Sequence, residues 1–197
     1  VYMSAPQPVS TTTQYPLIAA SFGGSILQAQ MLTQDYVAAS VISPTNEVGC
    51  IPFGANAFNG KTALVSRGGC EFGLKALNAQ NAGASFVIIH NSAAGGNGPI
   101  GMAGGTVGDQ VTVPVISIGY SAGLELAAFN AAHPTNAQLT VDTTGFQAGN
   151  TPDLIASFSS RGPSTRNSLK PDIAAPGVNI MAQGYGDGGG EARHLGY

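Results

Sequence analysis

The sequence predicts a mixed α/β domain over residues 1–150. Two strand–turn–helix units carry this prediction. In the first unit, a strand over residues 62–67 leads through the glycine turn R-G-G-C into a helix over residues 71–81. In the second, a strand over residues 113–118 leads into a helix over residues 121–132. The third observation is that 43% of the 197 residues are hydrophobic, which is enough to bury a core.

The segments before the first unit predict further extended structure. The first 16 residues hold three prolines and a T-T-T run, which indicates irregular or edge-strand backbone. Apolar clusters at residues 17–22 and 36–42 predict two strands. The N-G pair at 59–60 predicts a turn before the first unit.

The boundaries of the helices and of the later strands are also marked. The first helix is expected to end at Gly83, because glycine favours the backbone that closes a helix. Residues 85–90, S-F-V-I-I-H, are typical of a buried strand, and His90 at its end is expected to be a satisfied histidine rather than an acid or base. Ser121 is expected to cap the second helix, and residues 138–143 predict a last strand.

Residues 91–110 predict a long glycine-rich loop. A Walker A site is excluded because the loop has no lysine, and a dinucleotide site is excluded because the loop leads into V-T-V-P instead of a helix. A loop of this length without structure of its own is usually functional or disordered. We expect it to be an adaptable contact surface.

The charge distribution excludes two classes of partner. Only 9% of residues are charged, the net charge is −3, and no stretch concentrates Lys or Arg, so the sequence predicts no contact with nucleic acid. No apolar run approaches the ~20 residues that span a bilayer, so it predicts no membrane segment. Since Val1 is not an initiator, we expect a piece of a longer protein, with any signal peptide upstream.

The two cysteines, Cys50 and Cys70, leave two readings open. A metal site is not expected, because no His, Asp or Glu cluster stands near either residue. They are either unpaired buried thiols or, as we favour, a disulfide that closes a loop of about 20 residues and contributes about 3 kcal/mol. A disulfide requires an oxidising compartment. With a surface solvated by neutral polar groups, this predicts an extracellular, secreted protein.

The stretch G-Y-S-A-G at 119–123 matches the nucleophile elbow of α/β-hydrolases, with Ser121 at its centre. The alternative function is therefore a self-sufficient α/β-hydrolase that uses Ser121. Its histidine would be His194, preceded by an acid at Asp142, Asp153 or Asp172. Two short helices cannot cover both faces of a hydrolase sheet, and 28 glycines make chance matches common, so we expect an ordinary strand–turn–helix step.

The end of the chain resembles subtilisin-like serine proteases, the subtilases. The resemblance rests on F-S-S-R-G-P at 158–163 and K-P-D-I-A-A-P-G-V-N-I at 170–180, in the family's order and spacing. It implies that residues 151–197 are a fragment of a subtilase catalytic domain, partly flexible on its own. The residues that carry the motifs are expected to be structural: Ser160, Arg161, Gly162, Pro163, Asp172, Pro176 and Gly177.

Residues 1–150 resemble the protease-associated (PA) domain inserted in many large subtilases. Three blocks carry this resemblance, at residues 59–72, 78–91 and 113–126. It implies a three-layer β/β/α sandwich of the swivelling type. It also implies that the Cys50–Cys70 bond fastens the turn before the first helix to a neighbouring strand.

The resemblance implies a non-catalytic accessory role. The family motifs D-[ST]-G, H-G-T and G-T-S-M-A, which carry the catalytic triad, are missing, so this chain alone is expected to have no catalytic residue and no activity. The intact protein is expected to be a serine endopeptidase. No cofactor or metal is expected; calcium is common in subtilases, but no site is placed here.

The implied partners are polypeptides. The domain is expected to gate substrate access or to mediate protein interaction. Its partners would be the protein or peptide substrates, its own peptidase domain or a second copy in a homodimer. The residues expected to make these contacts lie in the glycine-rich loop: Asn91, Gly95, Gly96, Asn97 and Met102.

Overall fold

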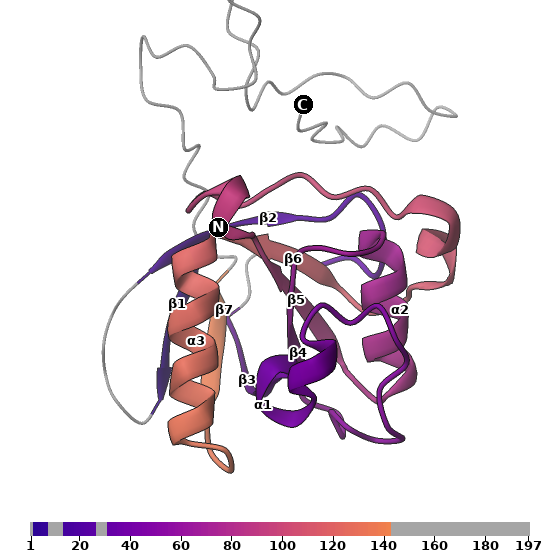
Figure 1. The fold of residues 1–197 in the computed structure, drawn as a ribbon. Helices are drawn as coiled ribbons and strands as arrows, with labels where there is room; N and C mark the ends of the chain where they lie inside the picture. The colour runs from indigo at the N-terminus through magenta and orange to yellow at the C-terminus, as the bar shows by residue number, and fades with distance from the viewer. Residues whose placement is uncertain (1, 8–13, 27–30, 143–197) are drawn as a thin grey trace, which may run out of the picture. The chain divides into compact units, whose positions relative to one another are not determined.

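The computed structural model describes residues 2–7, 14–26 and 31–142 (Figure 1). The predicted peptidase segment 151–197, with its motif residues from Ser160 to Gly177, lies outside the described residues. The strands in the described part of the chain are β1 (Tyr2–Gln7), β2 (Tyr15–Ala19), β3 (Met31–Ala38), β4 (Thr62–Ser66), β5 (Phe86–His90), β6 (Val115–Ile118) and β7 (Gln138–Asp142). The helices are α1 (Ala39–Ile42), α2 (Phe72–Asn81) and α3 (Tyr120–Ala132), with 3-10 turns η1 (Pro44–Asn46), η2 (Ala93–Gly95) and η3 (Gly105–Gln110).

The strands join edge to edge in the order β1-β2-β6-β5-β4-β3-β7 and close into a barrel. The pairs β3–β4, β4–β5 and β5–β6 are parallel, whereas the pairs β2–β6, β1–β2, β1–β7 and β3–β7 are antiparallel. The parallel part follows from the sequence, because a helix or a long loop separates these strands and returns the chain to the same edge of the sheet. In register, Ser66 lies opposite His90, and His90 opposite Ile118.

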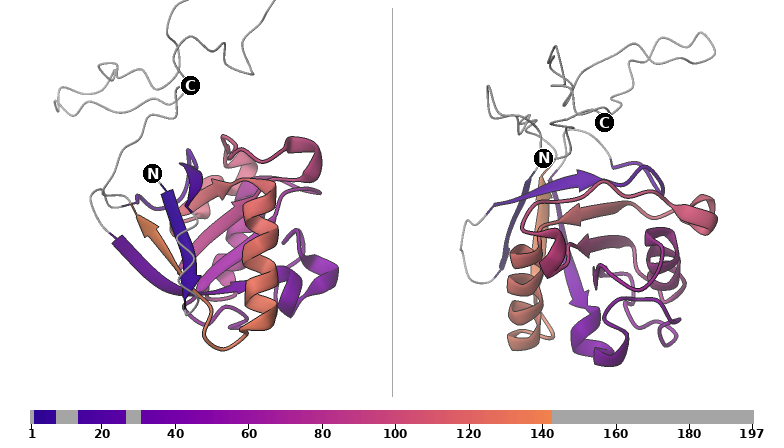
Figure 2. Two further views of the ribbon diagram at one scale, coloured as in Figure 1. Left: turned by 90° about the vertical axis from the view of Figure 1, so that its left-hand side faces the viewer. Right: turned by 45° about the horizontal axis from the view of Figure 1, so that its top comes forward.

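Strand β3 joins two sheets. Its residues 31–35 pair with β7, whereas its residues 36–38 pair with β4. The β1–β7 side and the β4–β5–β6 side therefore form two β layers, and α2 covers the outer face of the second layer (Figures 1 and 2). The predicted mixed α/β class is confirmed, with the refinement that the two β layers are continuous at their edges.

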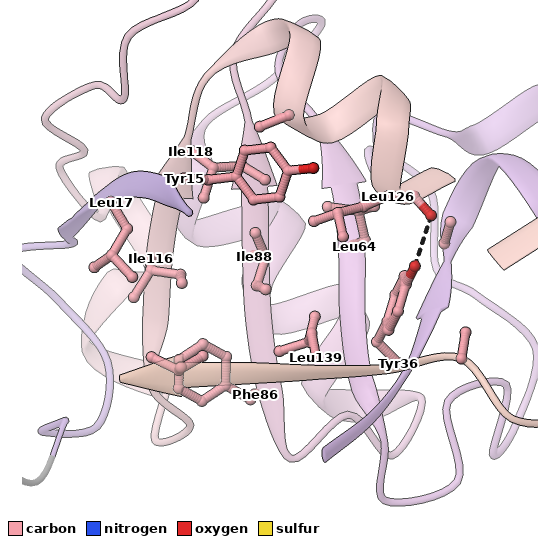
Figure 3. Packing of buried hydrophobic residues seen from close by; sticks show 14 residues of the cluster. Tyr15, Leu17, Tyr36, Leu64, Phe86, Ile88, Ile116, Ile118, Leu126 and Leu139 are labelled. Carbon is pink, nitrogen blue, oxygen red and sulfur yellow. Dashed lines mark hydrogen bonds between the residues drawn. The ribbon is translucent and has the colours of Figure 1, made fainter. Parts of the chain in front are cut away.

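Two apolar cores lie on the two faces of β4, β5 and β6. Because strand side chains alternate, Leu64 enters the core under α3 while Ala63 and Val65 enter the core under α2. In the first core, the buried Tyr36 hydroxyl donates a hydrogen bond to the carbonyl of Leu126 on α3, at 2.8 Å (Figure 3). Figures 1 and 2 show α2 and α3 on different sides of these strands.

Two predictions about the N-terminal half are wrong. The segment 36–42 was expected to be one strand, but β3 ends at Ala38 and α1 follows. At the end of β3, the side chain of Asn130 on α3 accepts a hydrogen bond from the N–H of Ala38 and donates one to the carbonyl of Tyr36. These backbone groups of β3 therefore bond a helix side chain instead of a neighbouring strand. Of the opening residues, β1 is not an edge strand, because it pairs with β2 on one side and with β7 on the other.

The glycine-rich segment 91–110 is more ordered than its composition predicts. It contains η2 and η3, and hydrogen bonds fix it at several points. The N–H and carbonyl of Ile100 both bond the hydroxyl of Ser117, and the carbonyl of Met102 accepts from Ser21. Gly73 makes this packing possible, since a Cβ on it would lie 1.9 Å from the carbonyl oxygen of Gly104.

Candidate functional site

A pocket of about 340 Å³ opens at the carboxyl ends of β4 and β5, beside the start of α3. Among its lining residues are Glu47, Ser66, Arg67, His90, Tyr120 and Leu124. In α/β folds, ligands commonly bind beyond the carboxyl ends of parallel strands. The parallel register of β4 and β5 accounts for the meeting of these side chains, because it places the last residues of both strands at one edge.

Ser66 and His90 form a hydrogen-bonded pair in the pocket. His90 Nδ1 lies 2.8 Å from the carbonyl oxygen of Asn91, which can only accept, so Nδ1 carries the ring proton. Nε2 then accepts from the hydroxyl of Ser66, also at 2.8 Å. Burial lowers the pKa of His90. The hydrogen bond to the Asn91 carbonyl and the negative charge of Glu47 raise this pKa, but their effects are smaller. The pair therefore presents a neutral imidazole and a serine hydroxyl, and His90 is the satisfied strand-end residue that was predicted.

Asn91 holds the loop that forms one wall of the pocket. Its side chain is fully buried, and its Oδ1 accepts from the Arg67 guanidinium at 2.9 Å and from the N–H of Ser92 at 2.8 Å. Its Nδ2 donates to the carbonyls of Gly95 and Gly98, at 2.8 and 3.0 Å. One amide thus ties β4, the end of β5 and the following loop together.

The G-Y-S-A-G stretch is a packing motif. Helix α3 begins at Tyr120 with Gly119 as its N-cap, so the prediction that Ser121 caps the helix is wrong. The loop supplies that function, because Asn97 Oδ1 accepts the N–H of Ser121 at 3.2 Å. Gly123 is required by close contact, since a Cβ there would lie 2.1 Å from Cγ of His90.

The position of Ser121 differs from that of a nucleophile in a hydrolase elbow. Its side chain is exposed in the first turn of α3, and the histidine nearest the motif, His90, bonds Ser66 instead. The other proposed histidine, His194, lies outside the described residues. The match to G-x-S-x-G therefore reflects two glycines needed for packing.

The disulfide is present. Cys50 and Cys70 are bonded, with their Cα atoms 5.8 Å apart, which replaces the alternative of two unpaired thiols. The bond joins the turn before α2 to the segment that follows η1. Both joined segments border the pocket, through Arg67 and Glu47 respectively.

The predicted contact residues of the loop fall into two groups. Gly95 and Asn97 are exposed and Gly96 is half-buried, so these three remain accessible to a partner. Asn91 and Met102 are buried: Asn91 organises the loop, and Met102 belongs to the core under α2. Their contact with a partner stays a prediction.

Sequence reasoning missed several pocket residues. Glu47, Ser66, Arg67, Tyr120 and Leu124 were not named as site residues, although all five line the pocket. The sequence could have indicated Ser66 and Arg67, because they lie at the carboxyl end of β4, which pairs in parallel with β5. Glu47 and Leu124 reach the pocket only through tertiary packing, which no local pattern encodes.

Within residues 2–7, 14–26 and 31–142, no group of three or more His, Cys, Asp or Glu side chains could hold a metal ion. No helix in the same part of the chain is long and apolar enough to cross a membrane.

The fold and the pocket define a small α/β domain with a hollow lined by polar residues at the carboxyl ends of its parallel strands. Residues 32–126 match the model of the PA domain family. These residues are therefore a PA domain, as the three sequence blocks predicted.

Similar proteins include subtilisin-like proteases of a plant and an extracellular protease of a bacterium. The chain is 36% identical over 126 residues to subtilisin-like protease SBT1.6 of Arabidopsis thaliana, which covers 62% of this chain and 15% of that protein. It is 30% identical to SBT1.5 of the same plant over 179 residues, with 85% and 20% covered. It is 35% identical to the minor extracellular protease Vpr of Bacillus subtilis over 134 residues, with 66% and 15% covered. The chain thus spans between 15% and 20% of the length of these relatives.

Proposed function

We propose that this chain is a non-catalytic accessory domain of a secreted subtilisin-like serine endopeptidase, and that its pocket contacts polypeptide. The observation that carries the proposal is the similarity to subtilisin-like proteases, which extends over 85% of the chain in one relative and so beyond the PA domain itself. The hydrolysis of peptide bonds belongs to the intact parent protein.

The chemistry of the pocket suits a polypeptide segment. The hydroxyl of Ser66 and the guanidinium of Arg67 supply polar groups that pair with peptide N–H, carbonyl or carboxylate groups. Leu124, 48% exposed, supplies an apolar contact on the rim, and Tyr120 lies beside it in the lining. Ligand sites of this kind combine apolar surface with a few well-placed polar groups. The partner would be a protein substrate, the peptidase domain of the same protein or a second copy of it.

The exposed part of the glycine-rich loop lies next to the pocket and would extend the contact. A deletion of residues 94–105 in the parent protease is a poor test of this role, because it removes Met102 from the core under α2. Point substitutions at exposed positions, such as Asn97→Ala, leave that core intact.

The absence of catalysis by this chain is directly testable. We expect no labelling when the purified chain is incubated with a fluorophosphonate probe, which reacts with activated serines. Labelling that disappears in Ser121→Ala would instead support the self-sufficient hydrolase. Labelling that disappears in Ser66→Ala would assign the nucleophile to the Ser66–His90 pair. Chymotrypsin in the same experiment serves as the positive control.

Secretion is part of the proposal. A disulfide persists in oxidising compartments, and the Cys50–Cys70 bond is consistent with export. One similar protein, Vpr, is named an extracellular protease. Detection of the parent protein in culture medium rather than in cells would support this localisation, and its retention in cells would contradict it.

A further inference from the structure

Lys75 is a buried cation beside the disulfide. It lies on α2 with none of its surface exposed, and its Nζ donates hydrogen bonds to the carbonyls of Val48 and Gly68. The same Nζ lies 3.6 Å from Sγ of Cys50. Lysine is rarely buried completely, so this position requires a physical reason.

Among the described residues, no carboxylate forms an ion pair with this ammonium. The carboxylate of Glu71, the N-cap residue of α2, accepts hydrogen bonds from the N–H and the hydroxyl of Thr106. The two carbonyls belong to Val48 and Gly68, which directly follow the charged residues Glu47 and Arg67 in the sequence. Neither charge contributes to the shift in the pKa of Lys75. Burial alone lowers that pKa to about 8, so the side chain is still mainly protonated at pH 7. The ammonium therefore faces two neutral carbonyls and a sulfur.

We propose that Cys50–Cys70 is an exchange-active disulfide, in which an external thiol attacks Cys70 and the Lys75 ammonium stabilises the departing thiolate of Cys50. In the first step, the thiolate RS⁻ forms a bond to Sγ of Cys70 as the bond between the cysteines breaks, and the electron pair goes to Sγ of Cys50. The products are a mixed disulfide on Cys70 and a Cys50 thiolate paired with Lys75. A second RS⁻ then releases RSSR and the thiolate of Cys70, so two external thiols are oxidised and the disulfide is reduced.

The geometry favours Cys50 as the leaving group. A thiolate next to a lysine ammonium has a lowered pKa, and a thiol of lower pKa leaves faster in exchange. The contact with Lys75 is made by Cys50 and not by Cys70. Cys70 also lies outside the first turn of α2, because it precedes Glu71, the N-cap residue. The macrodipole acts mainly within that turn.

An external thiol can reach the bond. Cys50 and Cys70 are both partly exposed. Gly69, which directly precedes Cys70 in the turn, is exposed. Gly69 has a φ of +76°, and a Cβ on it would lie 2.9 Å from Sγ of Cys50. Glycine thus keeps the Cys50 side of the bond free of a side chain, while access of a thiol to Cys70 rests on the partial exposure of Cys70 itself.

The exchange would act on the pocket. The disulfide joins the segment after Glu47 to the turn after Arg67, and both residues line the pocket. Reduction would leave these two walls connected only through hydrogen bonds, such as that from the N–H of Ser66 to the carbonyl of Glu47. This inference stands on contacts within the domain and does not depend on the proposed function.

The experiment identifies the attacked sulfur. The folded 197-residue chain is incubated with glutathione, the reaction is quenched with iodoacetamide, and peptides are analysed by mass spectrometry. We expect glutathione on Cys70 and the alkyl group on Cys50. The opposite pattern, or equal amounts of both adducts, would overturn the proposal.

A second measurement examines the role of Lys75. In the fully reduced wild-type chain, the pH dependence of alkylation should give Cys50 a pKa about one unit or more below 8.5, the ordinary value of a cysteine, whereas Cys70 stays near it. In Lys75→Met, the two cysteines should titrate alike, and the preference for Cys70 in the glutathione reaction should be lost. Lys61→Met, which removes a partly exposed lysine that pairs with Asp35, should behave as wild type. A wild-type Cys50 that titrates like Cys70 overturns the proposal even if Lys75→Met does not fold.

Discussion

Substitution of Asn91 by alanine should destabilise the domain by about 2–4 kcal/mol. The amide makes four hydrogen bonds, to Arg67, Ser92, Gly95 and Gly98, and it is fully buried. Each intramolecular hydrogen bond contributes about 0.5–1.5 kcal/mol, and a buried partner left unpaired costs more. The free energy of unfolding, from urea denaturation of the 197-residue chain followed by circular dichroism, measures the effect.

Asn97→Ala is the matched control. Asn97 lies in the same loop, but it is exposed and its amide accepts a single hydrogen bond, from the N–H of Ser121. Loss of such a helix-capping contact costs about 1 kcal/mol. Equal destabilisation by the two variants would contradict the role of Asn91 as the centre of the loop.

Gly123→Ala should destabilise the domain by about 1–3 kcal/mol, the range for an added methyl group in a packed site. The new Cβ would lie 2.1 Å from Cγ and 2.2 Å from Cβ of His90. The imidazole has little freedom to move away, because hydrogen bonds to Ser66 and to the Asn91 carbonyl hold both of its nitrogens. Alanine otherwise favours a helix over glycine by about 1 kcal/mol, so a loss of stability would be a direct sign of the close contact.

Gly98→Ala provides the comparison. A Cβ on Gly98 meets no atom within 4 Å, and its φ is not in the left-handed region. This substitution should leave the free energy of unfolding within about 0.5 kcal/mol of wild type. If Gly123→Ala were as stable as Gly98→Ala, the packing interpretation of G-Y-S-A-G would be wrong.

The fold was largely predictable from the sequence because its central elements have strong local signals. The β-branched run of β5 and the glycine turns that flank α2 determine those elements to within a residue or two. The disulfide between Cys50 and Cys70 was also predictable, because only two cysteines are available in the chain.

The remaining features depend on contacts between distant segments. The change from β3 to α1 is supported by Asn130, which lies more than 90 residues further along the chain. The cap of α3 comes from Asn97 rather than from the serine at the helix start. Likewise, Glu47 and Leu124 enter the pocket only through tertiary packing, and Lys75 is buried because α2 packs over the disulfide loop. Local propensity contains no information about such partners.

The most direct test of the proposed accessory role is a ratio measured in the complete parent protease. The ratio compares kcat/KM for a folded protein substrate with kcat/KM for a short chromogenic peptide. Leu124→Ala removes the exposed apolar contact on the pocket rim, and Ile18→Ala removes a similarly exposed side chain that is not part of the pocket lining.

Leu124→Ala should lower this ratio about fivefold, since burial of the exposed half of this leucine side chain contributes about 1 kcal/mol and 1.4 kcal/mol corresponds to a factor of ten. Ile18→Ala should leave the ratio unchanged. In both variants the rate on the short peptide should match that of the wild type, because the catalytic residues are untouched. A ratio that is the same in wild type and in Leu124→Ala would contradict a contact between the pocket and the protein substrate.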